Sequence, residues 1–343
     1  MKKIKYFANC ENEYLKSLGL MDEKDNFTIT YEKLNNEWKS IKNINIKCIF
    51  PKEICDLITA SYENLVDWII SLFLLSELDY SKVKKDIDNL KLLKYKGIYD
   101  KKIADFFIKY SSELNIYSCF YCDSSFSGIY RNNKKNERTF DVEHFFPNEQ
   151  YPMFSISLYN FIPSCQVCNS RVKGSSNFLD FYNLDKTSST IKNKLLNLSP
   201  TSEIFNINEY LKIKIYPSIN YFTYYRKSHY EKWSYCPCFS KAKQSYQIFF
   251  DVDKKTPYLN HIKAFKLQER YNNVAIKSQG LYLEDLKRKY PDSNLKLISE
   301  LLNKGNTQKL IKGFSYQEIK DAIFHQDNKY ALLQKMRNDI IYE

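Results

Sequence analysis

The sequence predicts an α+β protein that is mainly α-helical, with a small mixed core near the middle of the chain. Three observations predict this class. Apolar residues recur at helical spacing in the first third and the last quarter of the chain. Turn residues and short β-prone runs lie between these parts. Two Cys-x-x-Cys pairs bracket a segment of this central part. Apolar residues make up 43% of the chain, with only 7 glycines and 9 prolines, which indicates a folded globular protein.

Residues 1–110 are expected to form a mainly helical N-terminal region. Residues 1–50 are mixed in character and predict no definite element. From residue 51 onward, the run "PKEICDLITASYENLVDWIISLFLLSEL" places apolar residues close to the 3.6-residue period of an amphipathic helix. The positions that follow this period are Ile54, Leu57, Ile58, Leu65, Ile69, Leu72 and Phe73.

Residues 201–343 are expected to form a basic C-terminal region that begins with a β insert at about 204–252. Alternating apolar residues in "YLKIKIYP" predict one strand, "INYFTYYR" is rich in β-prone aromatic residues, and "SYQIFFDV" has the pattern of a partner strand. From residue 257 onward, runs such as "NLKLISELLNK" return to helical spacing.

The charge of the chain favours an anionic partner. The formal net charge is +12, and residues 201–343 supply most of it, with 24 Lys and Arg against 15 Asp and Glu. Nucleic acid is the commonest partner of proteins with such a basic excess. If the protein binds nucleic acid, we therefore expect the C-terminal region to make many of the contacts with the phosphate backbone.

The chain is expected to be cytoplasmic and to have no membrane partner. Its start, "MKKIKYFANCENEY", lacks the apolar stretch of a signal peptide. The most apolar run, "LVDWIISLFLL", is too short to span a bilayer and contains Asp67. The 9 cysteines are an odd number in a chain without a secretion signal, so we expect reduced thiols.

The two Cys-x-x-Cys pairs predict a structural zinc site. Cys119 and Cys122 form the first pair, and Cys165 and Cys168 form the second after 42 intervening residues. Four thiolates match the tetrahedral ligand set of Zn²⁺ and leave no position open for a substrate. The alternative is four unrelated cysteines. Cys236 and Cys238, with His229 or His261, suggest a second metal site, but no matching pair lies nearby.

A group of polar residues lies within residues 111–200, between and just after the cysteine pairs. The segments are "DVEHFFP", "NFIPSCQVCN" and then "SRVK". With the first cysteine pair, "CFYC", they resemble the pattern of HNH endonucleases, the zinc-containing branch of the ββα-metal nucleases. The matching positions are Glu143, His144, Pro147, Asn160, Asn169 and Lys173. The family more often has Asp before the histidine, and its lysine one residue earlier. Residues 111–200 are therefore expected to form an HNH nuclease core.

The resemblance implies a metal-dependent hydrolysis of phosphodiester bonds. His144 would act as the general base that takes a proton from water. Glu143 and Asn169 would hold a catalytic Mg²⁺ or Mn²⁺ ion. Asp141 is an alternative ligand of this ion or a partner for His144. Because neighbouring residues of a strand face opposite sides, convergence of Glu143 and His144 on one phosphate predicts a bulge or turn there.

Three further residues are implied by the same resemblance. Asn160 would brace the loop and orient the base. Lys173 lies four residues after Asn169, so both would share one helix face, and Lys173 would contact a phosphate. Arg171 is a weaker candidate for a phosphate contact, because its position also suits a solvated helix face.

Two functions from different classes follow from these features. The first is an endonuclease that cuts DNA, with double-stranded DNA as the expected substrate. The flanks also look like those of bacterial HNH proteins of phage-defence operons, where an ATPase often accompanies the nuclease. One such site cuts one strand at a time, so a double-strand break would need two copies of the protein or two successive binding events. A homo-oligomer would supply the second copy. The alternative is a non-catalytic zinc-stabilised module that binds nucleic acid or protein, which leaves Glu143, His144 and the two asparagines unexplained.

Overall fold

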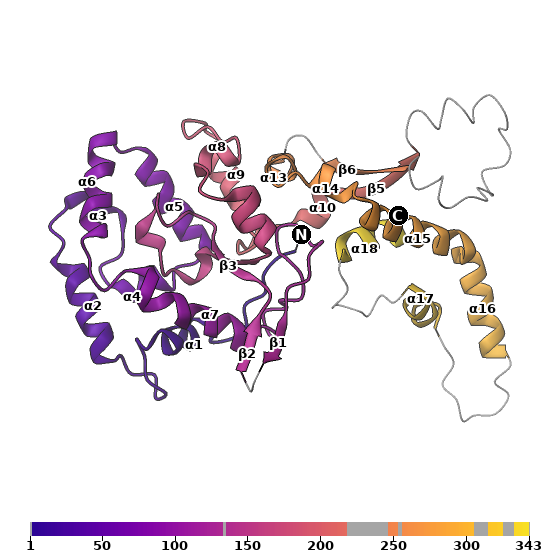
Figure 1. Cartoon of the computed structure of the whole chain (residues 1–343), viewed down its shortest axis with the longest axis horizontal. Helices are drawn as coiled ribbons and strands as arrows, with labels where there is room; N and C mark the ends of the chain where they lie inside the picture. The colour runs from indigo at the N-terminus through magenta and orange to yellow at the C-terminus, as the bar shows by residue number, and fades with distance from the viewer. Residues whose placement is uncertain are drawn as a thin grey trace. The chain divides into compact units, whose positions relative to one another are not determined.

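The computed structural model describes residues 2–132, 135–217, 246–252, 256–304, 315–324 and 333–342 (Figure 1). Within these residues the chain is mainly helical, and its strands form two-stranded antiparallel sheets. The predicted α+β, mainly helical class is confirmed at this level. Contacts divide the chain into two compact units. The first comprises Met1–Tyr210 and Asp253–Phe265, and the second comprises Leu211–Val252 and Lys266–Glu343.

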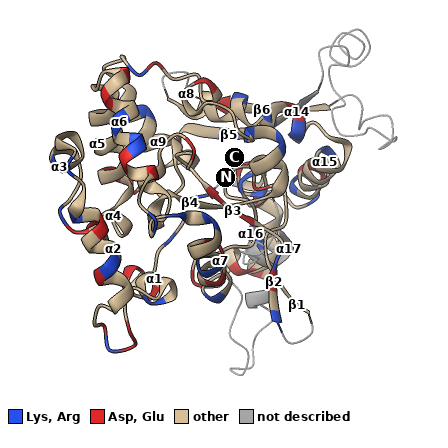
Figure 2. Cartoon of the chain, turned by 60° about the vertical axis from the view of Figure 1, so that its left-hand side comes forward, with Lys and Arg blue, Asp and Glu red and all other residues tan. Residues whose placement is uncertain are grey.

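Helices make up the N-terminal half of the first unit. They are α1 (Cys10–Leu18), α2 (Ile29–Ser40), α3 (Ile44–Ile49), α4 (Ile54–Ile58), α5 (Tyr62–Phe73), α6 (Glu77–Asp88), the single turn η1 (Tyr95–Tyr99) and α7 (Asp100–Lys109). Ser61 and Ser76 start α5 and α6, since their hydroxyls accept hydrogen bonds from backbone N–H groups three residues later. Acidic and basic residues are interspersed on α6, which is a solvent-facing helix (Figure 2).

The most apolar run of the sequence forms α5, as its period predicts. The side chains of Leu65, Val66 and Ile69 are fully buried on one face of this helix. The exposed Asp67 lies on the opposite face, where it pairs with Lys192. Among the described residues, no helix is long and apolar enough to cross a lipid bilayer.

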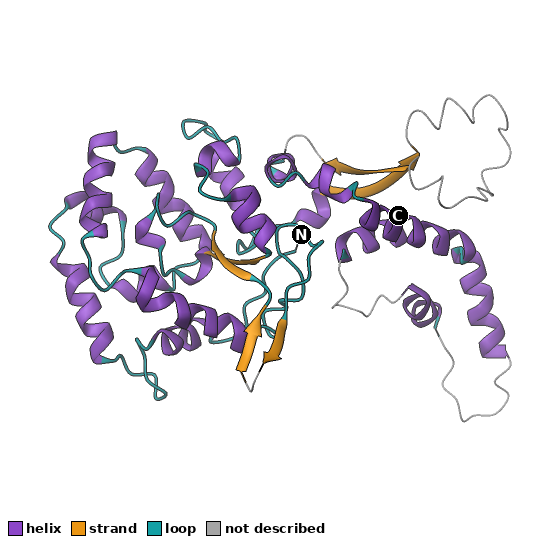
Figure 3. Ribbon diagram, in the orientation of Figure 1, coloured by secondary structure: helices purple, strands orange, loops and turns teal. Residues whose placement is uncertain are grey.

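The central part of the first unit holds two short strand pairs (Figure 3). Strands β1 (Ile129–Asn132) and β2 (Lys135–Arg138) pair with each other, as do β3 (Asp141–His144) and β4 (Phe161–Ser164). The remaining elements are η2 (Pro152–Phe154), η3 (Leu158–Asn160), the helical segment η4 (Val167–Lys173), α8 (Phe178–Phe181), α9 (Ile191–Leu198), α10 (Ile207–Tyr210) and α13 (Tyr258–Ala264).

Aromatic packing fixes the chain directly after β3 against α5. The rings of Phe146 and Tyr62 are nearly parallel, with centroids 5.7 Å apart. Phe145 meets the same Tyr62 ring edge-on at 5.5 Å. Phe154 packs at 6.3 Å from Trp68. Phe145, Phe146 and Phe154 are all fully buried, so the loop between β3 and β4 belongs to the core rather than the surface.

The second unit is built around the hairpin of β5 (Leu211–Pro217) and β6 (Tyr246–Val252). Its helices are α14 (Leu267–Tyr271), α15 (Val274–Lys289), α16 (Asp292–Lys304), α17 (Tyr316–Phe324) and α18 (Gln334–Tyr342). Ile213 and Ile248 are buried on one face of the hairpin. The buried Asp339 of α18 accepts a hydrogen bond from the Ile213 amide at 2.7 Å. The β-prone run at 219–226 and the suggested metal site at Cys236 and Cys238 lie outside the described residues.

Candidate metal centre and active site

The four predicted zinc ligands come together in one buried cluster. The Sγ atoms of Cys119, Cys122, Cys165 and Cys168 all lie within 4.8 Å of one another. The Sγ atoms of Cys122 and Cys165 are 3.9 Å apart. A Zn–S bond of about 2.3 Å in a tetrahedron places neighbouring sulfurs about 3.8 Å apart. The cluster therefore fits a structural metal ion such as zinc, which confirms the predicted grouping of the cysteines.

Backbone hydrogen bonds shape the first cysteine turn. Cys119 N donates to the Ser125 carbonyl at 3.0 Å, and Asp123 N donates to the Cys119 carbonyl at 2.8 Å. The hydroxyl of Ser118 donates to the Asp123 carboxylate at 2.6 Å. Phe120 N donates to the Pro163 carbonyl of β4 at 3.3 Å, so the turn is attached to the strand that leads to the second cysteine pair.

His261, considered from the sequence only for a second metal site, supports this turn instead. His261 of α13 is only 1% exposed, and its Nε2 lies 2.9 Å from the Tyr121 carbonyl between the first two cysteines. Burial lowers the pKa of His261 to about 4, so the ring is neutral near pH 7. A neutral ring that donates from Nε2 satisfies a carbonyl that would otherwise be buried alone. No sequence signal links two residues 140 positions apart.

Strands β3 and β4 pair without interruption, so the bulge expected at residues 143–144 is wrong. Asp141 lies opposite Ser164, and the register continues residue by residue to His144 opposite Phe161. Asp141 and Glu143 therefore face one side of the ribbon, and His144 faces the other. Each face has its own partner, since η4 contacts Glu143 on one side and the Ser155 carbonyl contacts His144 on the other. No bulge is needed to satisfy these side chains.

The side chain of His144 is held in a fixed orientation and remains partly exposed. Its Nε2 lies 2.9 Å from the Ser155 carbonyl. The rings of Tyr95 and Phe161 each lie 4.7 Å from the imidazole. Burial lowers the pKa of His144 to about 4, although the hydrogen bond with Ser155 acts in the opposite direction. Because Nε2–H must donate to a carbonyl, Nδ1 of the neutral ring carries the free lone pair.

Glu143 and Lys173 form a buried ion pair. Glu143 is 7% exposed and Lys173 is 2% exposed. The Lys173 ammonium donates to Glu143 Oε1 and to the His144 carbonyl, the latter at 2.6 Å. Burial raises the pKa of Glu143, while Lys173 and the neighbouring Tyr121 hydroxyl oppose this shift. For Lys173 to contact a phosphate, as predicted, the phosphate would have to reach an ammonium group that is buried in the protein. The carboxylate of Glu143, the predicted metal ligand, is already paired with that ammonium.

Replacing Lys173 with methionine is expected to lower the free energy of unfolding by about 3–5 kcal/mol, because an unpaired carboxylate then remains buried. Chemical denaturation at neutral pH measures this loss. The double variant with Glu143→Gln and Lys173→Met should regain a large part of it, since no buried charge remains. Arg171→Met is the matched control, because Arg171 is an exposed cation of the same segment and should change the free energy by less than about 0.5 kcal/mol. Equal losses for Lys173→Met and Arg171→Met would contradict the ion-pair assignment.

Asp141 and Asn169 meet at the surface of the same module. The Nδ2 atom of Asn169 donates to Asp141 Oδ2 at 3.0 Å, and both side chains are partly exposed. A carboxylate and an amide oxygen are ligands that hard divalent ions prefer. Among the predicted metal ligands, Asp141 and Asn169 therefore fit such an ion better than Glu143 does.

Asn160 ties the two ends of the loop after His144 together. Its side chain is fully buried. Its Oδ1 accepts from the Phe146 amide at 2.8 Å, and its Nδ2 donates to the carbonyls of Phe146 and Phe154, both at 3.1 Å. These contacts hold the chain that leaves His144, which is the position expected of a bracing residue.

No protein-family model, curated protein or solved structure matches this chain. Support for any function therefore comes from the chemistry of the residues described above.

Proposed function

We propose that this protein is a metal-dependent HNH endonuclease that hydrolyses phosphodiester bonds in DNA. The observation that carries the proposal is the setting of His144. It lies at the end of β3 in a strand–strand–helix succession of β3, β4 and η4. The first cysteine pair of the cluster precedes β3, and the second lies where β4 leads into η4. A structural histidine such as His261 can be fully buried, whereas His144 is partly exposed, as a base that must meet water needs to be.

In this proposal His144 takes a proton from the attacking water at Nδ1. The Ser155 carbonyl fixes the tautomer and the direction of the ring. Tyr95 limits the movement of the imidazole, since it contacts that ring edge-on. Tyr95 also lies close enough to Asp141 and Arg138 for both charges to act on the pKa of its hydroxyl, which burial raises. Asp141 faces the side of β3 opposite His144, so this proposal requires the phosphate to lie at the edge of the β3–β4 ribbon, where both side chains can reach it.

Asp141 and Asn169 would hold a catalytic Mg²⁺ or Mn²⁺ ion. When bound, such an ion supplies a Lewis acid that stabilises the negative charge developing on the phosphate. Glu143 contributes indirectly in this proposal, because its ion pair with Lys173 attaches η4 to β3. Asn169 and Asp141 are thereby kept at hydrogen-bonding distance. Arg171 is exposed on the same segment and is the better candidate for a phosphate contact than Lys173.

The biological setting is proposed from the same features. Double-stranded DNA is the proposed substrate, with the basic C-terminal region as a further contact. A cytoplasmic role in anti-phage defence, with an ATPase as partner, follows from the resemblance of the flanks alone. A single His144 site acts on one strand at a time, so cutting both strands would require a second copy or a second encounter.

A non-catalytic zinc module is the second candidate. The enclosure of Glu143 and Lys173 favours it, since two of the residues expected at a catalytic site serve a buried ion pair instead. This candidate predicts one bound zinc ion, binding of nucleic acid or protein, and no cleavage.

Incubation of the full chain with supercoiled plasmid separates the two candidates. The endonuclease should produce nicked or linear DNA in Mg²⁺ or Mn²⁺, and brief treatment with EDTA should stop the reaction while the thiolate-bound zinc is retained. Intact plasmid in every metal, from protein that contains one zinc ion, would favour the binding module.

A further inference from the structure

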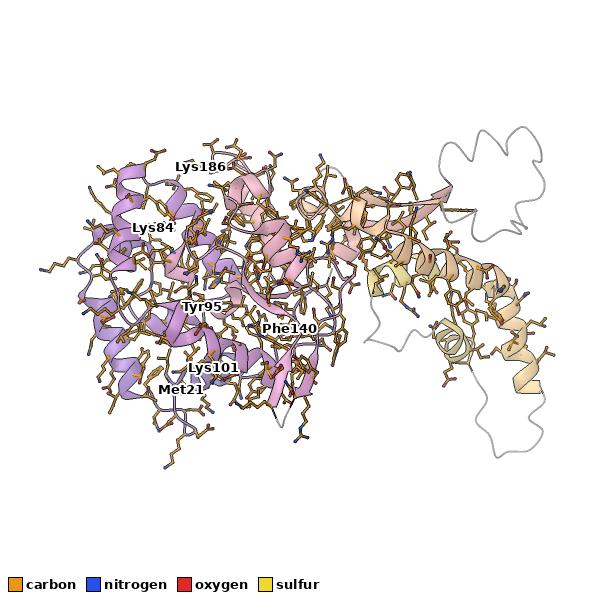
Figure 4. All side chains as sticks on the ribbon, viewed as in Figure 1. Met21, Lys84, Tyr95, Lys101, Phe140 and Lys186 are labelled. Carbon is orange, nitrogen blue, oxygen red and sulfur yellow. The ribbon has the colours of Figure 1, made fainter. Side chains whose placement is uncertain are left out.

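A cleft of about 430 Å³ lies in the first unit and is lined in part by residues that contact His144. It opens between α6, the chain before η1 and the loop that follows β3. Two of its lining residues, Lys84 and Tyr95, are labelled in Figure 4. Two of its lining residues, Tyr95 and Ser155, also hold the imidazole of His144. Ser155 is fixed in turn, because its hydroxyl donates to the Leu93 carbonyl at 3.0 Å. An occupant of this cleft would therefore contact two residues that hold the proposed base.

The cleft has a small excess of positive charge. Three lysines, Lys84, Lys94 and Lys96, line it together with two acidic residues, Asp88 and Glu149. Lys94 and Lys96 are exposed, and no salt bridge among the described residues engages either of them. Their ammonium groups are thus available for an anionic ligand.

The lining also contains apolar residues. Ile87, Leu90 and Leu93 contribute to it, and each is less than a tenth exposed. Tyr95 adds an aromatic ring, and Asn148 adds an amide that can donate and accept hydrogen bonds. A pocket of this size that combines cations with apolar lining residues suits a ligand with a phosphate at one end and a flat ring at the other.

We infer that this cleft binds one nucleotide of the substrate strand, next to the phosphate that is cut. Lys94 and Lys96 contact its phosphate, and the base lies against the apolar part of the lining with Tyr95. In a double-stranded substrate this base must first leave the stack. The inference rests on the proposed function for its substrate, and it makes Tyr95 a positioning residue that orients both the strand and His144. A free nucleotide carries the same chemistry, so the test distinguishes the two sources.

The test measures binding of a short fluorescent single-stranded DNA to the full chain in EDTA, at several salt concentrations. The double variant Lys94→Gln, Lys96→Gln should bind roughly tenfold more weakly, and its slope of log affinity against log salt should be smaller by about 1.4. The matched control is Lys47→Gln, Lys52→Gln, which removes the same charge from a separate cleft of about 360 Å³. This control should bind like the wild type.

Equal weakening in both double variants would overturn the inference, because only general charge attraction would then remain. Binding of free deoxyadenosine monophosphate that depends on Lys94 and Lys96, without any loss of strand affinity in that variant, would overturn the assignment to the strand. Tyr95→Ala should raise KM for cleavage more than Tyr95→Phe does, which separates positioning from a general structural role.

Failure of this inference can be told apart from failure of the proposed function. Strand binding in EDTA requires no cleavage, so a selective loss in the Lys94 and Lys96 variant supports the cleft even in an inactive protein. Cleavage and strand affinity at wild-type levels in that variant would reject the cleft and leave the nuclease proposal standing.

Discussion

Replacing Cys168 with serine is expected to release the zinc ion and to unfold the central part of the first unit. Cys168 is fully buried and its Sγ lies within the four-cysteine cluster. Structural zinc contributes about 10–16 kcal/mol in small zinc modules at neutral pH, which is comparable with the whole stability of a typical domain, about 5–15 kcal/mol. The chain between the cysteine pairs carries the whole of β3 and β4, so it would lose its attachment at both ends.

Zinc content per chain and thermal unfolding followed by circular dichroism measure this effect together. Cys48→Ser is the matched control, because Cys48 is an exposed thiol outside the cluster, and it should keep one zinc ion and the wild-type melting temperature. Prolonged treatment of the wild type with a strong zinc chelator should reproduce the Cys168→Ser result. A Cys168→Ser protein that melts like the wild type would show that the cluster is not a structural metal site.

Replacing His144 with alanine is expected to lower the rate of DNA cleavage by about 10²–10⁴-fold, the usual contribution of general base catalysis. The loss should appear in kcat on a labelled oligonucleotide, while zinc content stays at one ion per chain. The fold should persist, since β3 keeps its backbone pairing with β4 and Asn160 still holds the following loop.

Rescue by added imidazole distinguishes a lost base from a distorted site. Free imidazole can enter the space left by the His144 side chain, which is partly exposed in the wild type, and should restore part of the rate. Asn160→Ala offers the contrast, because it removes buried hydrogen bonds of the loop and should not respond to imidazole. A rate for His144→Ala equal to that of the wild type would remove His144 from the mechanism.

Features encoded by local spacing could be predicted from the sequence. The 3.6-residue period identified α5, and the alternation in residues 211–217 and 246–252 corresponds to the paired strands β5 and β6. The two Cys-x-x-Cys pairs predicted the four-cysteine cluster, because each pair presents two thiolates within a single turn. These signals depend on neighbours a few residues apart, which a sequence shows directly.

Features that depend on tertiary contacts could not be predicted. The Glu143–Lys173 pair spans 30 residues, and nothing in the sequence shows whether the lysine stem enters the core or reaches solvent. The bulge was expected because Glu143 and His144 were both taken to face one phosphate. Because Lys173 pairs with Glu143 on one face and the Ser155 carbonyl contacts His144 on the other, a regular strand gives each side chain a hydrogen-bond partner. The hydrogen bond between His261 and the first cysteine turn could not be predicted for the same reason, because only folding brings these two parts of the chain together.

Nicking of supercoiled plasmid by the wild type and by His144→Ala, purified in parallel, tests the central claim most directly. Both proteins should contain one zinc ion. The wild type should convert the plasmid to nicked or linear forms in Mg²⁺ or Mn²⁺ and leave it intact in EDTA, and His144→Ala should leave it intact in every condition. Equal cleavage by the two proteins, or none by a zinc-loaded wild type, would contradict the assignment of this site as a His144-dependent endonuclease.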